Sequence, residues 1–185
     1  MKQIKQIAVI AFLMFLGSKA SAQDTQTDNH TITVVVPNVA LLDLEATSKN
    51  FTSTFAQPTP LEAGEKLTAP ANNADLWLNY SSIVAASGIT SRRVQAKISA
   101  LVPGVDIAVT AAAAVNGAGT RGTGSTITLT ATDQNLVTGI GSAFTGTGVN
   151  NGHNLTYAFN ALDANYGNLR TASPVITVTY TLVDN

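Results

Sequence analysis

Residues 174–182 read Pro-Val-Ile-Thr-Val-Thr-Tyr-Thr-Leu, an alternation of apolar residues and threonines that decides the fold class. Successive side chains of a β-strand point to opposite faces, so a period of two predicts a strand with one buried face and one hydroxylated face. Threonine is β-branched and favours strands of this kind, and it is abundant after residue 22. The chain therefore reads first as a β protein.

The same alternation, or a short apolar run, recurs along the chain. It predicts six further strands, at residues 31–36, 76–80, 93–100, 105–112, 126–131 and 155–159. Residues 101–105 contain Pro-Gly at the centre and predict a type II turn at a hairpin tip. The glycine-rich stretches 116–124 and 139–152 are interpreted as loops.

Helix is scarce in this pattern. Residues 40–46 form either one helical turn or an extended segment, and no amphipathic helix separates the strands. Many short strands with frequent turn signals predict an all-β fold, an antiparallel immunoglobulin-like β-sandwich of about 7–9 strands.

The first 22 residues predict export. Lys2 and Lys5 form a basic start, residues 7–16 are almost wholly apolar, and Ala20-Ser-Ala22 has the small-x-small form of a signal peptidase site. The apolar run is too short to span a membrane. We therefore expect a cleaved signal peptide at 1–22, a flexible lead at 23–29 and a single β-sandwich domain at 30–185. The mature protein would be extracellular, cell-surface or periplasmic in a bacterium, without a membrane span.

Composition excludes several function classes. Removal of residues 1–22 leaves seven basic residues against all eleven acidic ones, a formal charge of −4. Arg92, Arg93 and Lys97 are the nearest approach to a basic cluster, and we expect them on a solvated strand face, so nucleic-acid binding is not predicted. The absence of cysteine excludes disulfides, thiolate metal sites and a cysteine nucleophile.

No catalytic constellation emerges from the sequence. His30 and His153 are the only histidines, neither has a partner at metal-ligand spacing, and both are expected at the surface. There is no Gly-x-Ser-x-Gly nucleophile elbow. Residues 117–122 match G-x-G-x-x-G, but a strand pattern follows where a dinucleotide site needs a helix. We predict a protein that is not an enzyme and holds no cofactor or metal.

A binding module remains the alternative. Trp77 points away from the face of Leu76 and Leu78, so it either packs at the rim of the sandwich or offers a stacking platform for a sugar. Tyr166, beside Gly167, is a second candidate ligand contact. Residues 133–135 and 163–165 each place two oxygen-bearing side chains two positions apart, which keeps a calcium-dependent ligand open although neither is a complete calcium loop. This alternative is a secreted glycan- or calcium-dependent binding module.

The export signal, the early valine-rich strand and the final strand at 174–180 together resemble bacterial fimbrial-type subunits, such as the spore-coat-U-like secreted pilus proteins. In those families the last strand often alternates threonine with valine and ends in tyrosine after an upstream glycine; Gly167 and Tyr180 occupy comparable places. Two features differ, because this chain has no cysteine for a disulfide and five residues follow Tyr180. The resemblance implies a sandwich that assembles by strand donation between subunits.

These observations together predict an exported, non-enzymatic structural or adhesive surface protein of fimbrial type. Its partners would be copies of itself or other surface subunits. The candidate assembly strand follows a polar lead and precedes Pro37, and an uncharged strand of this kind invites pairing with another chain. It consists of Thr31, Ile32, Thr33, Val34, Val35 and Val36.

Overall fold

The computed structural model describes residues 26–185, so the predicted signal peptide and the first three residues of the lead lie outside the described residues. The chain divides into two units, residues 1–35 and 36–185. Every strand of the described chain belongs to the second unit. No helix within residues 26–185 is long and apolar enough to cross a membrane.

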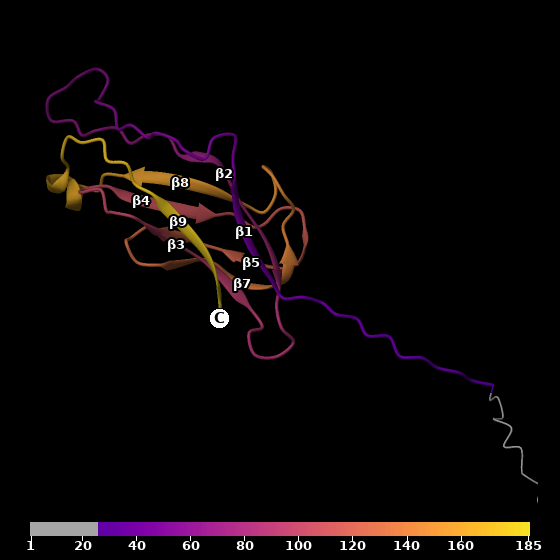
Figure 1. Ribbon diagram of the computed structural model, residues 1–185. Coiled ribbons are helices and arrows are strands. Elements are labelled where there is room, and N and C mark those ends of the chain that lie inside the picture. The colour runs from indigo at the N-terminus through magenta and orange to yellow at the C-terminus, as the bar shows by residue number, and fades with distance from the viewer. Residues whose placement is uncertain (1–25) are drawn as a thin grey trace, which may run out of the picture. The chain divides into compact units, whose positions relative to one another are not determined.

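The second unit is built almost wholly from antiparallel strands (Figure 1). The described residues form β1 (Val39–Glu45), β2 (Asn73–Ile83), β3 (Arg92–Ile98), β4 (Asp106–Ala111), β5 (Ala118–Gly124), β6 (Thr126–Thr128), β7 (Gln134–Phe144), β8 (His153–Asn160), the short 3₁₀ helix η1 (Asp163–Asn168) and β9 (Val178–Asp184). The predicted all-β antiparallel fold with little helix is confirmed.

One sheet folds over to form a sandwich-like arrangement. Its strands follow the order β6-β4-β8-β2-β7-β3-β9, with β1 beside β2 and β5 beside β7. Strands β8 and β9 are separated in this order by β2, β7 and β3, yet the hydroxyls of Tyr157 in β8 and Tyr180 in β9 are hydrogen-bonded. The two halves of the sheet therefore face each other. Burial raises the pKa of both hydroxyls.

Backbone hydrogen bonds join the two halves at several places. Strand β2 pairs with β8 at Leu76–Leu78 and then with β7 at Ser81 and Ser82. Between β5 and β6, Ser125 donates its N–H to Leu136 at 2.9 Å and accepts from Ala111 at 2.9 Å, so one residue bonds to both halves. These joints close the fold without disulfides.

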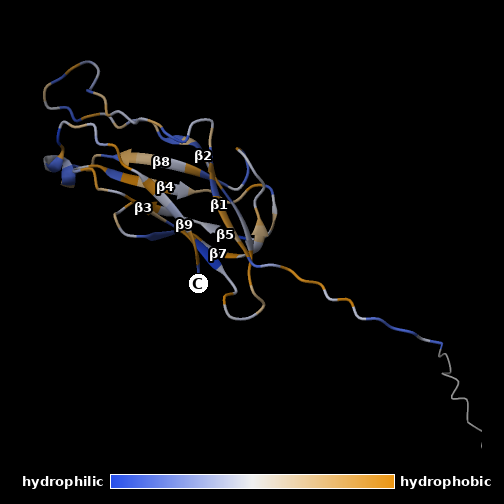
Figure 2. Cartoon of the chain, in the orientation of Figure 1, coloured by the Kyte–Doolittle hydropathy of each residue, from blue (hydrophilic) through white to orange (hydrophobic). Residues whose placement is uncertain are grey.

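The core follows the predicted alternation. In β3 every second residue is buried, and Val94 and Ala96 are fully enclosed. The buried apolar side chains come from both halves of the sheet; Figure 2 shows hydrophobic residues along strands of both halves. They are Leu76, Leu78, Tyr80, Val94, Ala96, Ile98, Ile107, Val109, Ala111, Leu129, Leu136, Val137, Ile140, Leu155 and Tyr157.

Some of the predictions for individual turns, loops and strands are confirmed and others are wrong. The type II turn is confirmed, because Val105 donates to Val102 at 3.0 Å and Gly104 has φ +77°. Residues 40–46 are extended and fall largely within β1. The loop prediction for the glycine-rich stretches was wrong for 118–124, which form β5, and for 139–144, which belong to β7, whereas residues 145–151 do form a loop. Residues 31–36 form no strand in the described chain.

Candidate assembly surface

The predicted assembly segment is apolar and unpaired within residues 26–185. No strand assignment falls between residues 29 and 38. Four of its side chains are strongly exposed: Ile32 is 72 % exposed, Val34 79 %, Val35 83 % and Val36 70 %. Figure 2 colours the stretch before β1 largely as hydrophobic. An exposed apolar run of this kind marks an interaction surface.

Strand β9 forms one end of the sheet and pairs only with β3 among the described strands. Ser99 donates to the carbonyl of Thr177 at 2.9 Å, and Asn185 donates to Ser91 at 3.1 Å. In an antiparallel ladder the hydrogen-bonded residues alternate, so the odd-numbered residues of β9 direct their backbone groups to β3. The N–H and C=O groups of Val178, Tyr180 and Leu182 therefore point to the open edge.

The inner face of β9 is incompletely covered. Ile176, Val178, Tyr180 and Leu182 pack against the core but remain half-buried, whereas the intervening threonines are exposed. Apolar side chains that reach the core at an open edge gain burial when another strand is added beside them. The edge thus offers both backbone hydrogen bonds and unburied apolar surface.

The other sheet edges are less suited to pairing. Strand β1 carries Asp43, which lies 3.4 Å from Lys49, and ends in Glu45; charged side chains on an edge strand oppose strand addition. Strand β6 has only three residues. The ladder of β5 with β7 shifts register between Gly119 and Arg121, and such irregularity also blunts an edge.

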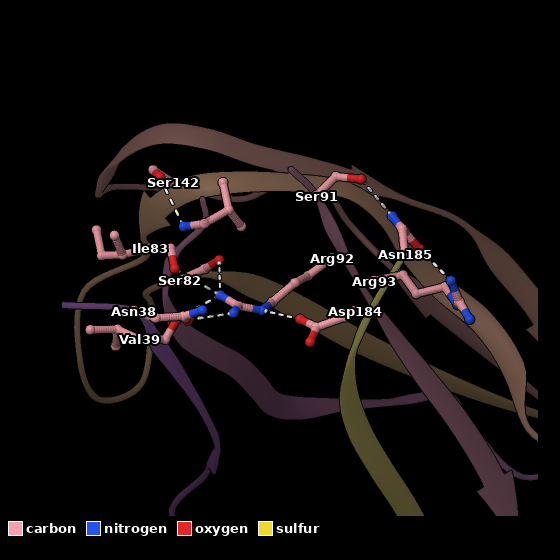
Figure 3. Close-up of polar contacts among 11 residues, drawn as sticks. Asn38, Val39, Ser82, Ile83, Ser91, Arg92, Arg93, Ser142, Asp184 and Asn185 are labelled. Atoms are coloured by element: carbon pink, nitrogen blue, oxygen red, sulfur yellow. Dashed lines mark hydrogen bonds and ion pairs between the residues drawn. The ribbon is translucent and has the colours of Figure 1, made fainter. Parts of the chain in front are cut away.

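A buried arginine joins the start of β1 to the end of β9 (Figure 3). Arg92 is 2 % exposed, and its guanidinium donates to five oxygens. These acceptors are Asp184 Oδ1 at 2.7 Å, Val39 O at 2.6 Å, Ser82 Oγ at 3.0 Å, Ile83 O at 3.2 Å and Asn38 Oδ1 at 2.7 Å. Four segments distant in sequence therefore meet at one charge.

This junction corrects the prediction that Arg92 lies on a solvated face. The sequence did carry a signal, since Arg92 is in phase with Val94, Ala96 and Ile98, the residues of β3 that fill the core. A buried guanidinium is tolerated when its nitrogens find acceptors, and here two backbone carbonyls, one carboxylate, one hydroxyl and one carboxamide oxygen supply them. The junction fixes Asn38, which is two residues beyond the assembly segment, beside the end of β9.

The two candidate ligand contacts lie apart. Trp77 is half-buried and lines a shallow pocket with residues of β2, β8 and two loops. Tyr166 lies in η1, and its hydroxyl accepts the backbone N–H of Leu67 at 3.0 Å. Neither of the two main pockets of the described chain is lined by both residues. Tyr166 thus anchors a loop, while Trp77 keeps a free surface.

The histidines differ from the prediction in one case. His30 is exposed, as expected, but His153 is fully buried beneath the sheet. Its Nδ1 donates to the carbonyl of Ala112 at 2.6 Å, and its Nε2 lies 2.9 Å from the hydroxyl of Tyr80, which itself donates to the carbonyl of Arg121. Burial lowers the pKa of His153, although its bonds to backbone carbonyls oppose this shift. The ring is a structural core group.

Known proteins provide no match that would identify the chain. No protein-family model, no curated protein and no solved structure matches it. Its function must therefore be inferred from its own residues and geometry.

Proposed function

We propose that this protein is an exported structural or adhesive surface subunit that assembles by β-strand pairing. Residues 31–36 of one copy add to the open edge of β9 in the next copy. The observation that supports this proposal is the combination of an exposed apolar segment without a strand partner in its own described chain and an edge strand, β9, that is uncharged from Val178 to Val183 and whose inner side chains are half-buried.

Strand addition would supply the hydrogen bonds that the segment at 31–36 lacks and the apolar cover that the edge of β9 lacks. The segment gains main-chain hydrogen bonds from the outward-facing groups of β9, and it covers the inner side chains of Val178 and Tyr180. Threonines on the outer face of β9 carry no charge that would repel an incoming strand. Work of this kind needs backbone edges and apolar faces and no catalytic side chain.

The alternation of the segment defines which side chains enter the core. Ile32, Val34 and Val36 share one face, and Val35 lies on the other with the threonines. We assign the Ile32 face to the interior, because it is wholly apolar. Val34 and Val35 are similarly exposed before pairing, at 79 % and 83 %, so they form a matched pair for mutation.

The test compares Val34→Asp with Val35→Asp in cells that export the protein. Wild-type material, run unboiled on a denaturing gel, should give a ladder that collapses on boiling, and negative-stain microscopy should show filaments. Val34→Asp should give monomer, because its carboxylate would be buried on pairing. Val35→Asp should retain the ladder, because its carboxylate would remain in water.

Two outcomes would contradict the proposal, and signal cleavage can be tested separately. Equal assembly of the Val34→Asp variant and the wild type would contradict pairing through the Ile32 face, as would a wild-type protein found only as monomer. N-terminal sequencing of the exported protein should begin at Gln23, which tests cleavage after Ala22.

A further inference from the structure

Trp77 lies on the outer face of the half-sheet that contains β1, β2 and β8. The strand register places Glu45 of β1 on one side of it and Asn154 of β8 on the other. Its neighbours Leu76 and Leu78 are 2 % and 0 % exposed and point into the core. A half-buried indole held between two paired strands is a rigid platform, since its backbone cannot shift without breaking both ladders.

The indole lines a pocket of about 440 Å³ whose other walls are mostly polar. The lining residues are Thr47, Ala74, Asp75, Trp77, Val149, Asn150 and Asn154. One carboxylate, two carboxamides and one hydroxyl thus surround a single aromatic ring. No lysine or arginine belongs to the lining of this described pocket.

The walls are fixed by bonds that leave other polar groups unused. Asn154 donates through Nδ2 to Ala74 O at 2.7 Å and Leu76 O at 3.2 Å, so its orientation is set. Asp75 accepts from Asn73 through Oδ2 only. The carbonyl of Asn150 accepts from Asn116 at 3.1 Å, which holds the loop wall. Within residues 26–185 the indole N–H of Trp77, Asp75 Oδ1 and Asn154 Oδ1 have no hydrogen-bond partner.

The geometry points to a neutral pyranose as the occupant of this pocket. A sugar ring has an apolar C–H face that packs on an indole and hydroxyls at its rim, which Asp75, Asn154 and Thr47 would bind. An anion would meet Asp75 without a compensating cation. A calcium ion needs six or more oxygen ligands, and the lining offers one carboxylate.

This site is separate from the proposed assembly surface. It shares no residue with the segment 31–36 or with β9, so either can fail while the other stands. In an assembled surface structure, each copy would present one such pocket to solvent. The occupant is then a sugar of a neighbouring cell surface or matrix, bound weakly by each copy and strongly by the array through multivalency.

The chain contains a single tryptophan, so its fluorescence reports this pocket alone. Purified mature protein is titrated with methyl pyranosides of glucose, galactose and mannose, and with N-acetylglucosamine. We expect a saturable emission change with at least one of them, with a dissociation constant on the order of 1 mM as befits an open pocket. Glycerol, which has hydroxyls but no ring face, should give none.

Two variants and one chelator complete the test. Asp75→Ala should weaken binding at least about tenfold, because a charge-assisted hydrogen bond is lost. Asn168→Ala, in the exposed η1, is the matched control and should bind as the wild type does. No emission change with any pyranoside at about 100 mM would overturn the inference. So would unchanged binding by Asp75→Ala, or loss of binding on adding EDTA.

Discussion

Two segments of this chain carry the same Ile-Thr-Val triplet and have opposite structures. Ile32-Thr33-Val34 lies in a stretch without any strand assignment, and its apolar side chains are largely exposed. Residues 176–178 lead into β9: Val178 pairs with Ile98 of β3, Thr177 accepts from Ser99, and Ile176 and Val178 pack half-buried against the core. Pattern alone therefore does not make a strand.

The difference lies in the partner. Strand β9 is held along seven consecutive residue pairs by β3, and its end is fixed by Asp184 on the Arg92 guanidinium. The segment at 31–36 has equal β propensity but no ladder within the described chain. Strand formation depends on cross-strand neighbours and burial, which a second copy could supply to the segment.

Substitution of Arg92 should destabilise the region around β3 and β9 more than any other change predicted here. Arg92→Met removes the donor shared by Asp184, Asn38, the buried Ser82 hydroxyl and two part-buried backbone carbonyls. We expect the free energy of unfolding to fall by about 3 kcal/mol. Urea denaturation of the monomer measures this. Arg93→Met is the matched control on the opposite face of β3, where the side chain is half-buried, and should cost much less.

The triplets can be compared directly through the same substitution. Val178→Asp brings a carboxylate to the inner face of β9 and should destabilise the monomer by about 2 kcal/mol. Val34→Asp should change the unfolding free energy of the monomer by less than about 0.5 kcal/mol, because the site is exposed before assembly. Urea denaturation at a protein concentration below that of assembly gives both values. A large loss in Val34→Asp would show that the segment stabilises its own monomer.

Sequence pattern predicted the strands whose stability comes from alternating side chains. Strands β3 and β9 show a clear period of two; β3 lies within two residues of the expected bounds 93–100, whereas β9 begins four residues later than the expected start at 174. Their outward polar side chains and mostly apolar inward side chains satisfy both the period-two pattern of a strand and the burial that the fold requires. Trp77 was also correctly placed on the face opposite Leu76 and Leu78.

The missed strand β5 has a different origin. Glycine disfavours strands, so residues 118–124 read as a loop. The structure needs glycine there, because a Cβ at Gly119 would lie 2.2 Å from the carbonyl of Ser142, and one at Gly124 would lie 2.2 Å from that of Ala111. Close backbone approach depends on tertiary packing and leaves no periodic trace in the sequence.

The burial of two polar residues, Arg92 and His153, could not be predicted from composition either. Arginine and histidine are usually exposed, and the expectation failed for Arg92 and His153 because each finds backbone carbonyls that only the folded topology brings together. For the proposed assembly surface, the sequence indicated the segment at 31–36 but no acceptor edge. The edge proposed for it follows only from the strand order, which places β9 at the end of the sheet.

A mild fall in pH should act on the folded sandwich and leave the exposed segment at 31–36 unaffected. We expect this to be the smallest of the predicted effects. Burial lowers the pKa of His153 below its usual value near 6.5, so the unfolded chain binds a proton more readily than the folded one. Stability is therefore fully present above about pH 6.5 and declines as the pH falls below it. The decline acts on the folded sandwich, since His153 lies beneath β2 and β5 against Tyr80 and the carbonyl of Arg121.

The chain offers its own control, because its other histidine is the exposed His30 next to the assembly segment. Urea denaturation between pH 8 and 5 should show the free energy of unfolding falling with pH in the wild type and in His30→Gln alike. In His153→Gln the slope of this free energy against pH should be smaller. Only the slope is compared, since the substitution in the core lowers stability at every pH. An unchanged slope in His153→Gln would assign the acid sensitivity to carboxylates. A flattened slope in His30→Gln would assign the acid sensitivity to the exposed segment. The folded sandwich and the exposed segment would then no longer differ in their response to pH.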